Sequence, residues 1–284
     1  MRCPWALPLC LTMAAIAASP ACGSEPASPL VVCADPNDLP FSNRAGQGFE
    51  NQLARLLAHA MHAPLQYVWW AQRRGYVRST LNESKCRLWP GVATDTDTVT
   101  TTRAYYRSTY EFVTRRDRDL IGLTLDDPRL ESLSLGVQMI GNNATNTPPA
   151  HALARRGITE HVRGYMLYGQ YDQPNPVARI IEAVEHGEID VALVWGPVAG
   201  YFARRASVPL RLEPITPRLD GPGLPMTYAI SVGVRQGDLA LRDRINEILE
   251  REKPRIDRLL HAYGIPLLPA PANAVAETAS GTRP

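Results

Sequence analysis

The chain has 284 residues, of which 45% are hydrophobic and 20% are charged, values ordinary for a globular protein with a sizeable core. The formal charge is only +2 and the sequence contains no basic block. Length therefore allows one large domain or two smaller ones, and charge gives no case for nucleic-acid binding.

Residues 1–21 have the pattern of a secretory signal peptide. Arg2 precedes an uncharged apolar segment over 5–18 that is too short to span a bilayer, and small residues follow it. Cleavage after Ala17 and cleavage after Ala21 both fit, and an uncleaved anchor is the alternative. We expect a soluble periplasmic protein without a membrane span.

Two cysteines lie well beyond the signal segment. Cys3 and Cys10 leave with the signal peptide, Cys22 lies at its end, and Cys33 and Cys86 remain. An even pair in an oxidising compartment favours a disulfide. Because both cysteines fall on predicted strands, two buried free thiols are the alternative.

The first half of the chain alternates strands with helices. The apolar run 30–34 predicts a strand that opens into a turn-rich loop over 35–41. A helix over 49–61, with Glu50 near its start, follows the break at Gly46 and Gly48. Strands over 65–70 and 87–92 with a helix over 76–82 continue the alternation, which predicts a parallel sheet. Pro90 makes the length of the third strand uncertain.

A long extended strand over 105–115 is rich in aromatic and β-branched residues and has no helix after it. The alternation then restarts. Asp127-Pro128 predicts a helix start, followed by a strand over 133–140, a loop at 141–143, a helix from Thr147 to Gly157 and a strand over 162–168.

The stretch 177–204 is the most informative. Apolar residues at helical spacing predict a helix that Gly187 ends, and the run 189–195 predicts a buried strand. This strand breaks at Trp195-Gly196-Pro197. Because ligands bind at the carboxyl ends of strands in open α/β sheets, we expect Trp195 at the floor or rim of a cleft.

The remaining elements are strands over 210–215 and 227–234 and a final helix that begins near Leu241. Pro254 should kink or divide this helix. The last segment, 267–284, is rich in Ala, Pro and Thr and is predicted to be a disordered tail.

Two α/β units joined by extended segments at 105–115 and 227–234 resemble the two-lobed solute-binding proteins of family 3, which serve ABC importers of amino acids. The likeness implies an α/β, type II periplasmic binding protein fold with two crossover strands. Lobe 1 would comprise residues 30–114 and 225–266, and lobe 2 residues 115–224.

A narrower likeness involves several longer strings in the same order. They are CADPNDLPFSN (33–43), GFEN (48–51), QRRGYVR (72–78), YYRSTY (105–110), TPPAHALARRGI (147–158) and DVALVWGPVAGYFA (190–203). These strings resemble the MoxJ/XoxJ proteins, which are associated with pyrroloquinoline-quinone methanol dehydrogenases. The resemblance implies an accessory role in maturation or activation of such a dehydrogenase, with no cofactor and no catalytic residue of its own.

The expected cleft is unsuited to an amino acid. A receptor must neutralise both ends of a zwitterion, because an unpaired buried charge is costly. The resemblance to amino-acid receptors implies that Trp195 stands where those proteins have the aspartate that binds the ligand's amine. An indole cannot form a salt bridge with an ammonium group. Arg103 is the candidate for the carboxylate, although the segment before Tyr105 is short. We therefore expect no tight amino-acid binding.

The predicted partner-binding or ligand-binding cleft is aromatic and cationic, which suits a protein surface or a flat polycarboxylate. Trp69, Tyr105 and Trp195 are alternatively core residues, and Arg73 and Arg74 solvated ones. The residues predicted for this cleft are Phe41, Glu50, Trp69, Trp70, Arg73, Arg74, Tyr105, Tyr106, Arg107, Asn142, Asn143, Trp195 and Tyr201.

Two other functions stay open at this point. One is a solute-binding component of an ABC transporter for a small carboxylate-containing ligand. The other is an enzyme that uses an acid pair drawn from Asp35, Glu50 and Asp190. We expect no metal site, because His59 and His62 share a helix face without a nearby Cys or carboxylate to complete a ligand set.

Overall fold

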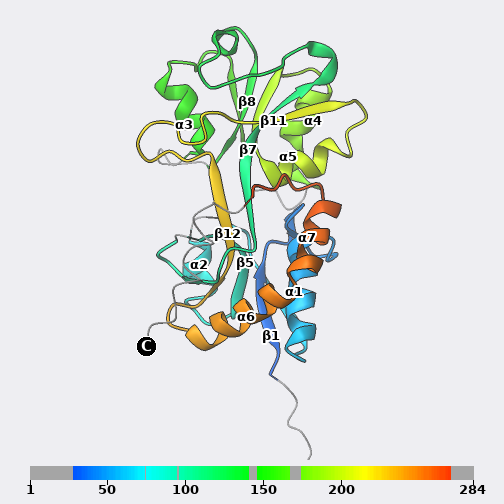
Figure 1. Cartoon of the computed structure of the whole chain (residues 1–284), viewed down its shortest axis with the longest axis vertical. Coiled ribbons are helices and arrows are strands. Elements are labelled where there is room, and N and C mark those ends of the chain that lie inside the picture. The colour runs from blue at the N-terminus through cyan, green and yellow to red at the C-terminus, as the bar shows by residue number, and fades with distance from the viewer. Residues whose placement is uncertain (1–27, 74, 95, 141–145, 167–173, 270–284) are drawn as a thin grey trace, which may run out of the picture.

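A computed structural model describes residues 28–269 except 74, 95, 141–145 and 167–173. The helices and strands form two lobes joined by long strands (Figure 1). This is the predicted two-lobed α/β arrangement. The proposed signal peptide at 1–21 lies outside the described residues. No helix within the described ranges is long and apolar enough to cross a bilayer.

The first lobe contains a sheet with strands in the order β4 (Leu65–Trp69), β1 (Leu30–Ala34), β5 (Leu88–Ala93) and β12 (Thr227–Val234), with β6 (Thr100–Thr101) beside β12. β1 runs parallel to β4 and β5, as predicted, and β12 is antiparallel to β5. Apolar faces of α1 (Phe49–Ala60), α6 (Leu239–Arg251) and α7 (Lys253–Ala262) cover one side of this sheet. Leu53, Leu57 and Ile245 are fully buried there.

On the opposite side of this sheet, α2 (Tyr76–Ser79) packs over a smaller core. Cys33 of β1 and Cys86 form a disulfide with a Cα–Cα distance of 5.5 Å. The disulfide, rather than two free thiols, is therefore the form of this pair. It ties β1 to the segment that precedes β5.

The second lobe has strands in the order β11 (Leu210–Pro214), β7 (Tyr106–Arg115), β10 (Val191–Trp195), β8 (Leu135–Met139) and β9 (Val162–Met166). β10 is parallel to β8 and antiparallel to β7. One face carries η3 (Pro176–Ala178), α4 (Arg179–Glu185) and α5 (Gly196–Ala203), and the other carries η2 (Pro128–Glu131) and α3 (Pro148–Arg155). A 3-10 turn, η1 (Arg116–Arg118), follows β7.

β7 and β12 connect the lobes. They pair antiparallel from Thr227 opposite Thr109 to Ile230 opposite Tyr106, and Figure 1 shows both strands passing from one lobe into the other. The two predicted crossover strands are confirmed. The chain stays in contact with β7 beyond the predicted end of the ordered region, because the Leu268 N–H donates to the Arg107 carbonyl at 2.9 Å.

Most predicted helices and strands are confirmed, but the sequence analysis missed α5 and the short strands β2 (Asn37–Asp38), β3 (Ser42–Asn43) and β6, and the helix predicted at Asp127-Pro128 is the 3-10 turn η2. A helix that the sequence analysis missed, α5, begins directly after Trp195, because Pro197 stands in its first turn, where a proline is tolerated. β5 continues through Pro90, and its register with β12 shifts between Ser231 and Gly233. Such an irregularity accommodates a residue that lacks a backbone donor.

Candidate functional site

A cavity of about 510 Å³ lies between the lobes. Its walls come from the loop after β1, the carboxyl ends of β8 and β10, the connecting strands and the segment that precedes β12. The described lining residues are Asp35, Asp38, Phe41, Gln72, Tyr110, Gln138, Ile140, Asn146, Pro148, Val177, Trp195, Val198, Gly223, Leu224, Pro225, Tyr228 and Ile230.

Trp195 is the last residue of β10 and lines this cavity. Its backbone N–H donates to Gln138 Oε1 at 2.9 Å. The indole lies 5.2 Å from the Tyr110 ring and 5.9 Å from the Tyr228 ring, both measured between centroids. An aromatic cluster, defined by Tyr110 of β7, Trp195 of β10 and Tyr228 of β12, therefore lines the cavity at the carboxyl end of β10.

Carboxyl groups face the cavity from the first lobe instead. The loop after β1 contains a short hairpin of β2 (Asn37–Asp38) and β3 (Ser42–Asn43). The carboxylate of Asp35 accepts hydrogen bonds from the Asn37 and Gln72 backbone N–H groups at 2.9 and 2.8 Å. Desolvation, and then repulsion by Asp35 and Glu50, raises the pKa of Asp38 well above its usual value. The first lobe thus gives the cavity an acidic wall.

Glu50, in the first turn of α1, lies behind this wall and is 3% exposed. Burial, with repulsion from Asp35, raises its pKa to about 8. Its Oε2 has no hydrogen-bond partner, and any side chain at Gly91 would collide with its Oε1. Glu50 is therefore a buried, mainly protonated acid rather than a residue of the cavity surface.

Two polar atoms of the cavity-lining residues lack partners. Gln138 is 1% exposed, and its Nε2 makes no hydrogen bond, although its Oε1 is held by Trp195. The Oδ1 of Asn146 is likewise buried without a partner. Since buried polar groups are normally paired, these two atoms mark places where an occupant can form hydrogen bonds.

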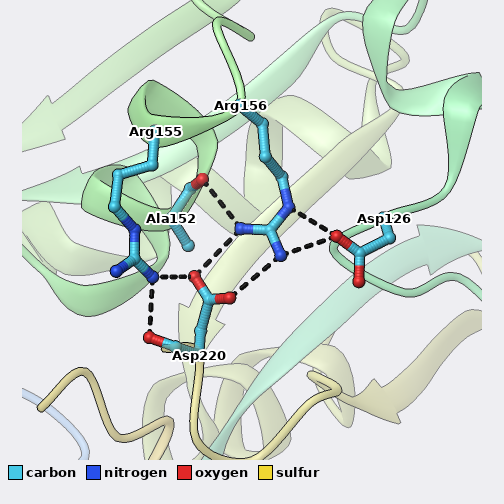
Figure 2. Close-up of polar contacts among 5 residues, drawn as sticks. All are labelled: Asp126, Ala152, Arg155, Arg156 and Asp220. Atoms are coloured by element: carbon cyan, nitrogen blue, oxygen red, sulfur yellow. Dashed lines mark hydrogen bonds and ion pairs between the residues drawn. The ribbon is translucent and has the colours of Figure 1, made fainter. Parts of the chain in front are cut away.

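Figure 2 shows the polar contacts of Asp220, which lies in the loop before β12. Asp220, 5% exposed, precedes Gly223, Leu224 and Pro225 of the lining. Arg156 pairs with both of its carboxylate oxygens at 2.9 Å, and Arg155 contacts both its carboxylate and its carbonyl. The Arg156 guanidinium holds the pKa of Asp220 below its usual value. These contacts fasten the loop before β12 to the end of α3.

Of the predicted cleft residues, Phe41 and Trp195 line the cavity. Tyr105 and Tyr106 lie in the core of the first lobe, where the Tyr106 ring packs against Phe49 of α1 with 5.9 Å between centroids. Tyr201 is buried on α5, stacked on Tyr263 at 5.7 Å.

The remaining predicted residues lie near the cavity or away from it. Trp69 stacks on Tyr67 at 4.7 Å, and Trp70 is 41% exposed with Lys85 over its ring. Arg107 donates to the Pro269 carbonyl at 2.8 Å, and Arg73 precedes the helix α2 outside the cavity lining. Predicted residues outside the described ranges are Arg74, Asn142 and Asn143.

Arg103 and Asp190 do not lie at the cavity, whereas Asp35 and Glu50 of the alternative acid pair lie close enough to raise the pKa of Glu50. Arg103 pairs with Glu250 of α6 at 2.9 Å, away from the cavity, because the chain before β7 runs along the helical face of the first lobe. Asp190 accepts hydrogen bonds from Ser134 and pairs with Arg118, at the opposite end of β10 from Trp195. It therefore forms no acid pair with Glu50 or Asp35.

Sequence reasoning missed Asp38, Gln138, Tyr110 and Tyr228 as cavity residues. Asp38 lies in the loop after the first strand. Because ligands bind at the carboxyl ends of strands in open α/β sheets, the reasoning that selected Trp195 could also have selected Asp38. The other three lie inside strand patterns that predict core. No set of three or more His, Cys, Asp or Glu side chains able to hold a metal ion occurs within the part of the chain that the structure describes.

The fold and this interlobe cavity define the class of periplasmic binding proteins. No protein-family model matches the chain. It is 35% identical over 268 residues to protein MoxJ of Methylorubrum extorquens, covering 90% of this chain and 85% of that protein. It is also 35% identical to protein MoxJ of Paracoccus denitrificans, covering 85% of this chain and 90% of the other. The chain belongs to the MoxJ/XoxJ family.

Solved structures agree with this assignment. The periplasmic binding protein XoxJ from Methylobacterium extorquens AM1 superposes with a TM-score of 0.69 at 33% identity, covering 85% of this chain and 100% of that one. An ancestral cationic amino acid solute-binding protein has a TM-score of 0.64 at 19% identity, covering 84% of this chain and 96% of that one. The second similarity concerns the fold alone.

Proposed function

We propose that this protein is a periplasmic accessory protein of a pyrroloquinoline-quinone methanol dehydrogenase. It acts in maturation or activation of the dehydrogenase by binding protein, without catalysing a reaction. Membership of the MoxJ/XoxJ family is the observation that carries this proposal. The signal-like segment at 1–21 and the binding-protein fold support export to the periplasm.

The cavity supports a role other than amino-acid delivery. Trp195 stands at the strand end where an amine would need a carboxylate, and no described lining residue is an arginine or a lysine that would pair with an α-carboxylate. A zwitterion would leave a desolvated carboxylate facing Asp35 and Asp38, which is costly. The same reasoning disfavours a small carboxylate delivered to an ABC importer.

We propose that the cleft rim, defined by Trp70 on the first lobe and Ile140 on the second, contacts the partner. Trp70 follows β4, and its N–H donates to the carbonyl of Ala34, so it lies at the same sheet edge as Asp35. Ile140, 38% exposed, lies at the corresponding end of β8 and lines the cavity. Exposed aromatic and aliphatic side chains of this kind are typical anchors in protein interfaces. We also propose that lobe 1 comprises residues 30–114 and 225–266 and that lobe 2 comprises residues 115–224.

Co-purification with the methanol dehydrogenase from the periplasm tests the proposal. Trp70→Ala and Ile140→Ala should each reduce recovery of the dehydrogenase, whereas Leu239→Ala should not. Leu239 is a matched control because it is 50% exposed at the start of α6, away from the cleft. Equal recovery of the dehydrogenase with all three variants would exclude the cleft rim as the contact surface. Failure of the wild-type protein to recover any dehydrogenase would contradict the accessory role.

A further inference from the structure

Among the described residues that line the interlobe cavity, the only acidic or basic side chains are carboxylic acids. Asp35 and Asp38 line it from the first lobe, with Glu50 buried behind them. None of the described lining residues is a lysine, an arginine or a histidine. In a site of low dielectric, carboxyl groups gathered in this way favour a positive occupant and disfavour a negative one.

The aromatic cluster favours the same sign of charge. Tyr110, Trp195 and Tyr228 contact one another through their rings, and Phe41 joins them in the lining. The faces of aromatic rings attract cations, most strongly in the case of tryptophan and most strongly in a desolvated site. A cationic head group would therefore meet rings from the connecting strands and the second lobe, and carboxyl groups from the first.

Gln138 provides an independent indication of a ligand. Its side chain is nine-tenths or more buried, and its orientation is fixed because Oε1 accepts the Trp195 N–H at 2.9 Å. The unpartnered atom is therefore Nε2, a donor, in a residue that lines the cavity. An occupant that brings an acceptor to Nε2 would remove the cost of this unmade hydrogen bond.

We propose that the interlobe cavity binds an organic ammonium group, with its charge against Asp38 and the aromatic cluster and with an acceptor of the same molecule on Gln138. The ligand bears no carboxylate next to the amine, which distinguishes it from an amino acid. A free alkylamine and the lysine side chain of a protein both present this group. The proposal does not depend on the dehydrogenase, because small probes test it alone.

Calorimetric titration of the full-length exported protein tests it. The probes are n-butylammonium and Nα-acetyl-lysine N-methylamide, compared with n-butanol and n-butyrate at matched ionic strength. We expect saturable one-to-one binding of at least one ammonium probe, about tenfold or more tighter than the neutral and anionic compounds. Tighter binding of the lysine derivative would assign the ammonium group to a protein side chain, and tighter binding of the amine to a small molecule. Binding of neither probe, or preference for butyrate, would overturn the proposal.

Variants locate the site. Asp38→Asn should weaken binding of the ammonium probe about tenfold or more, and Trp195→Leu should weaken it as well. Asp243→Asn, at an exposed carboxylate of α6 that pairs with Arg242, is the matched control and should leave affinity unchanged. Thermal unfolding of each variant establishes that it is folded. Unchanged affinity in folded Asp38→Asn would contradict the assignment.

Discussion

Glu50 links the stability of this protein to pH. Its pKa is raised from 4.5 to about 8 in the folded state, so between these values the folded protein holds a proton that the unfolded chain releases. The free energy of unfolding should therefore fall as pH rises through this range, by at most about 1.4 kcal/mol per pH unit for this group.

Glu50→Gln should reduce that slope and stabilise the protein near pH 8. Urea unfolding of both proteins at pH 5 and pH 8 measures the effect. Glu247→Gln, at an exposed position of the helix α6, is the control and should leave the slope as it is. A slope unchanged by Glu50→Gln would show that Glu50 is not protonated in the folded protein.

The disulfide between Cys33 and Cys86 should contribute substantially to stability. It closes a segment with a sequence separation of 53, for which the loss of chain entropy in the unfolded state corresponds to about 4 kcal/mol. Reduction, or replacement of both cysteines by serine, should lower the melting temperature in thermal unfolding. Equal melting temperatures with and without reductant would contradict this expectation.

The sequence predicts the position of some site residues and not of others. Trp195 lines the cavity, and the local signal that points to this position is a buried strand followed by a break. Tyr105 and Tyr201 carry no local signal of that kind. Their aromatic character fits a cleft and a core equally well, and only the packing of β7 against α1, and of α5 against α7, decides it.

At the scale of elements, the loop before β12 depends on the helix α3 for its position. Asp220 is buried and both of its carboxylate oxygens accept hydrogen bonds from Arg156, so removal of this guanidinium leaves the desolvated carboxylate with Arg155 as its remaining ion-pair partner. We expect Arg156→Met to destabilise the protein by about 2–3 kcal/mol.

Urea unfolding checks this value against Arg163→Met. The pair between Arg163 and Glu188 is exposed on both sides and should be worth less than about 1 kcal/mol. If the two variants were destabilised equally, the Asp220 contacts would have no special role in holding the loop.

The helices and strands themselves were largely predictable, because hydrophobic periodicity and the breaks caused by glycine and proline depend on neighbouring residues in the sequence. Gly187 has a φ of +73° just after α4, a conformation that suits glycine, and Pro254 lies where α7 begins. The helix α5 was missed because Gly196-Pro197 is typical of a break. Its first turn tolerates proline, and its burial by the surrounding core offsets the weak helix propensity of glycine.

At the scale of the whole molecule, the chain keeps the architecture of a solute receptor while its interlobe cavity has a different chemistry. The two-lobed fold with two connecting strands was implied by the resemblance to solute-binding proteins, which rests on two α/β units joined by extended segments. The acidic wall was not predicted, since the β2–β3 hairpin and the long-range packing of Glu50 against Gly91 bring Asp35, Asp38 and Glu50 together only in the folded chain.

The central claim is that this fold now serves a partner protein instead of amino-acid capture. Calorimetric titration of the exported protein with its own methanol dehydrogenase, repeated in a mixture of the neutral and acidic amino acids, which have no side-chain ammonium group, tests it most directly. The account predicts saturable binding of the dehydrogenase that the amino acids do not alter, and no binding of the amino acids themselves. Micromolar binding of an amino acid together with no heat on addition of the dehydrogenase would contradict it.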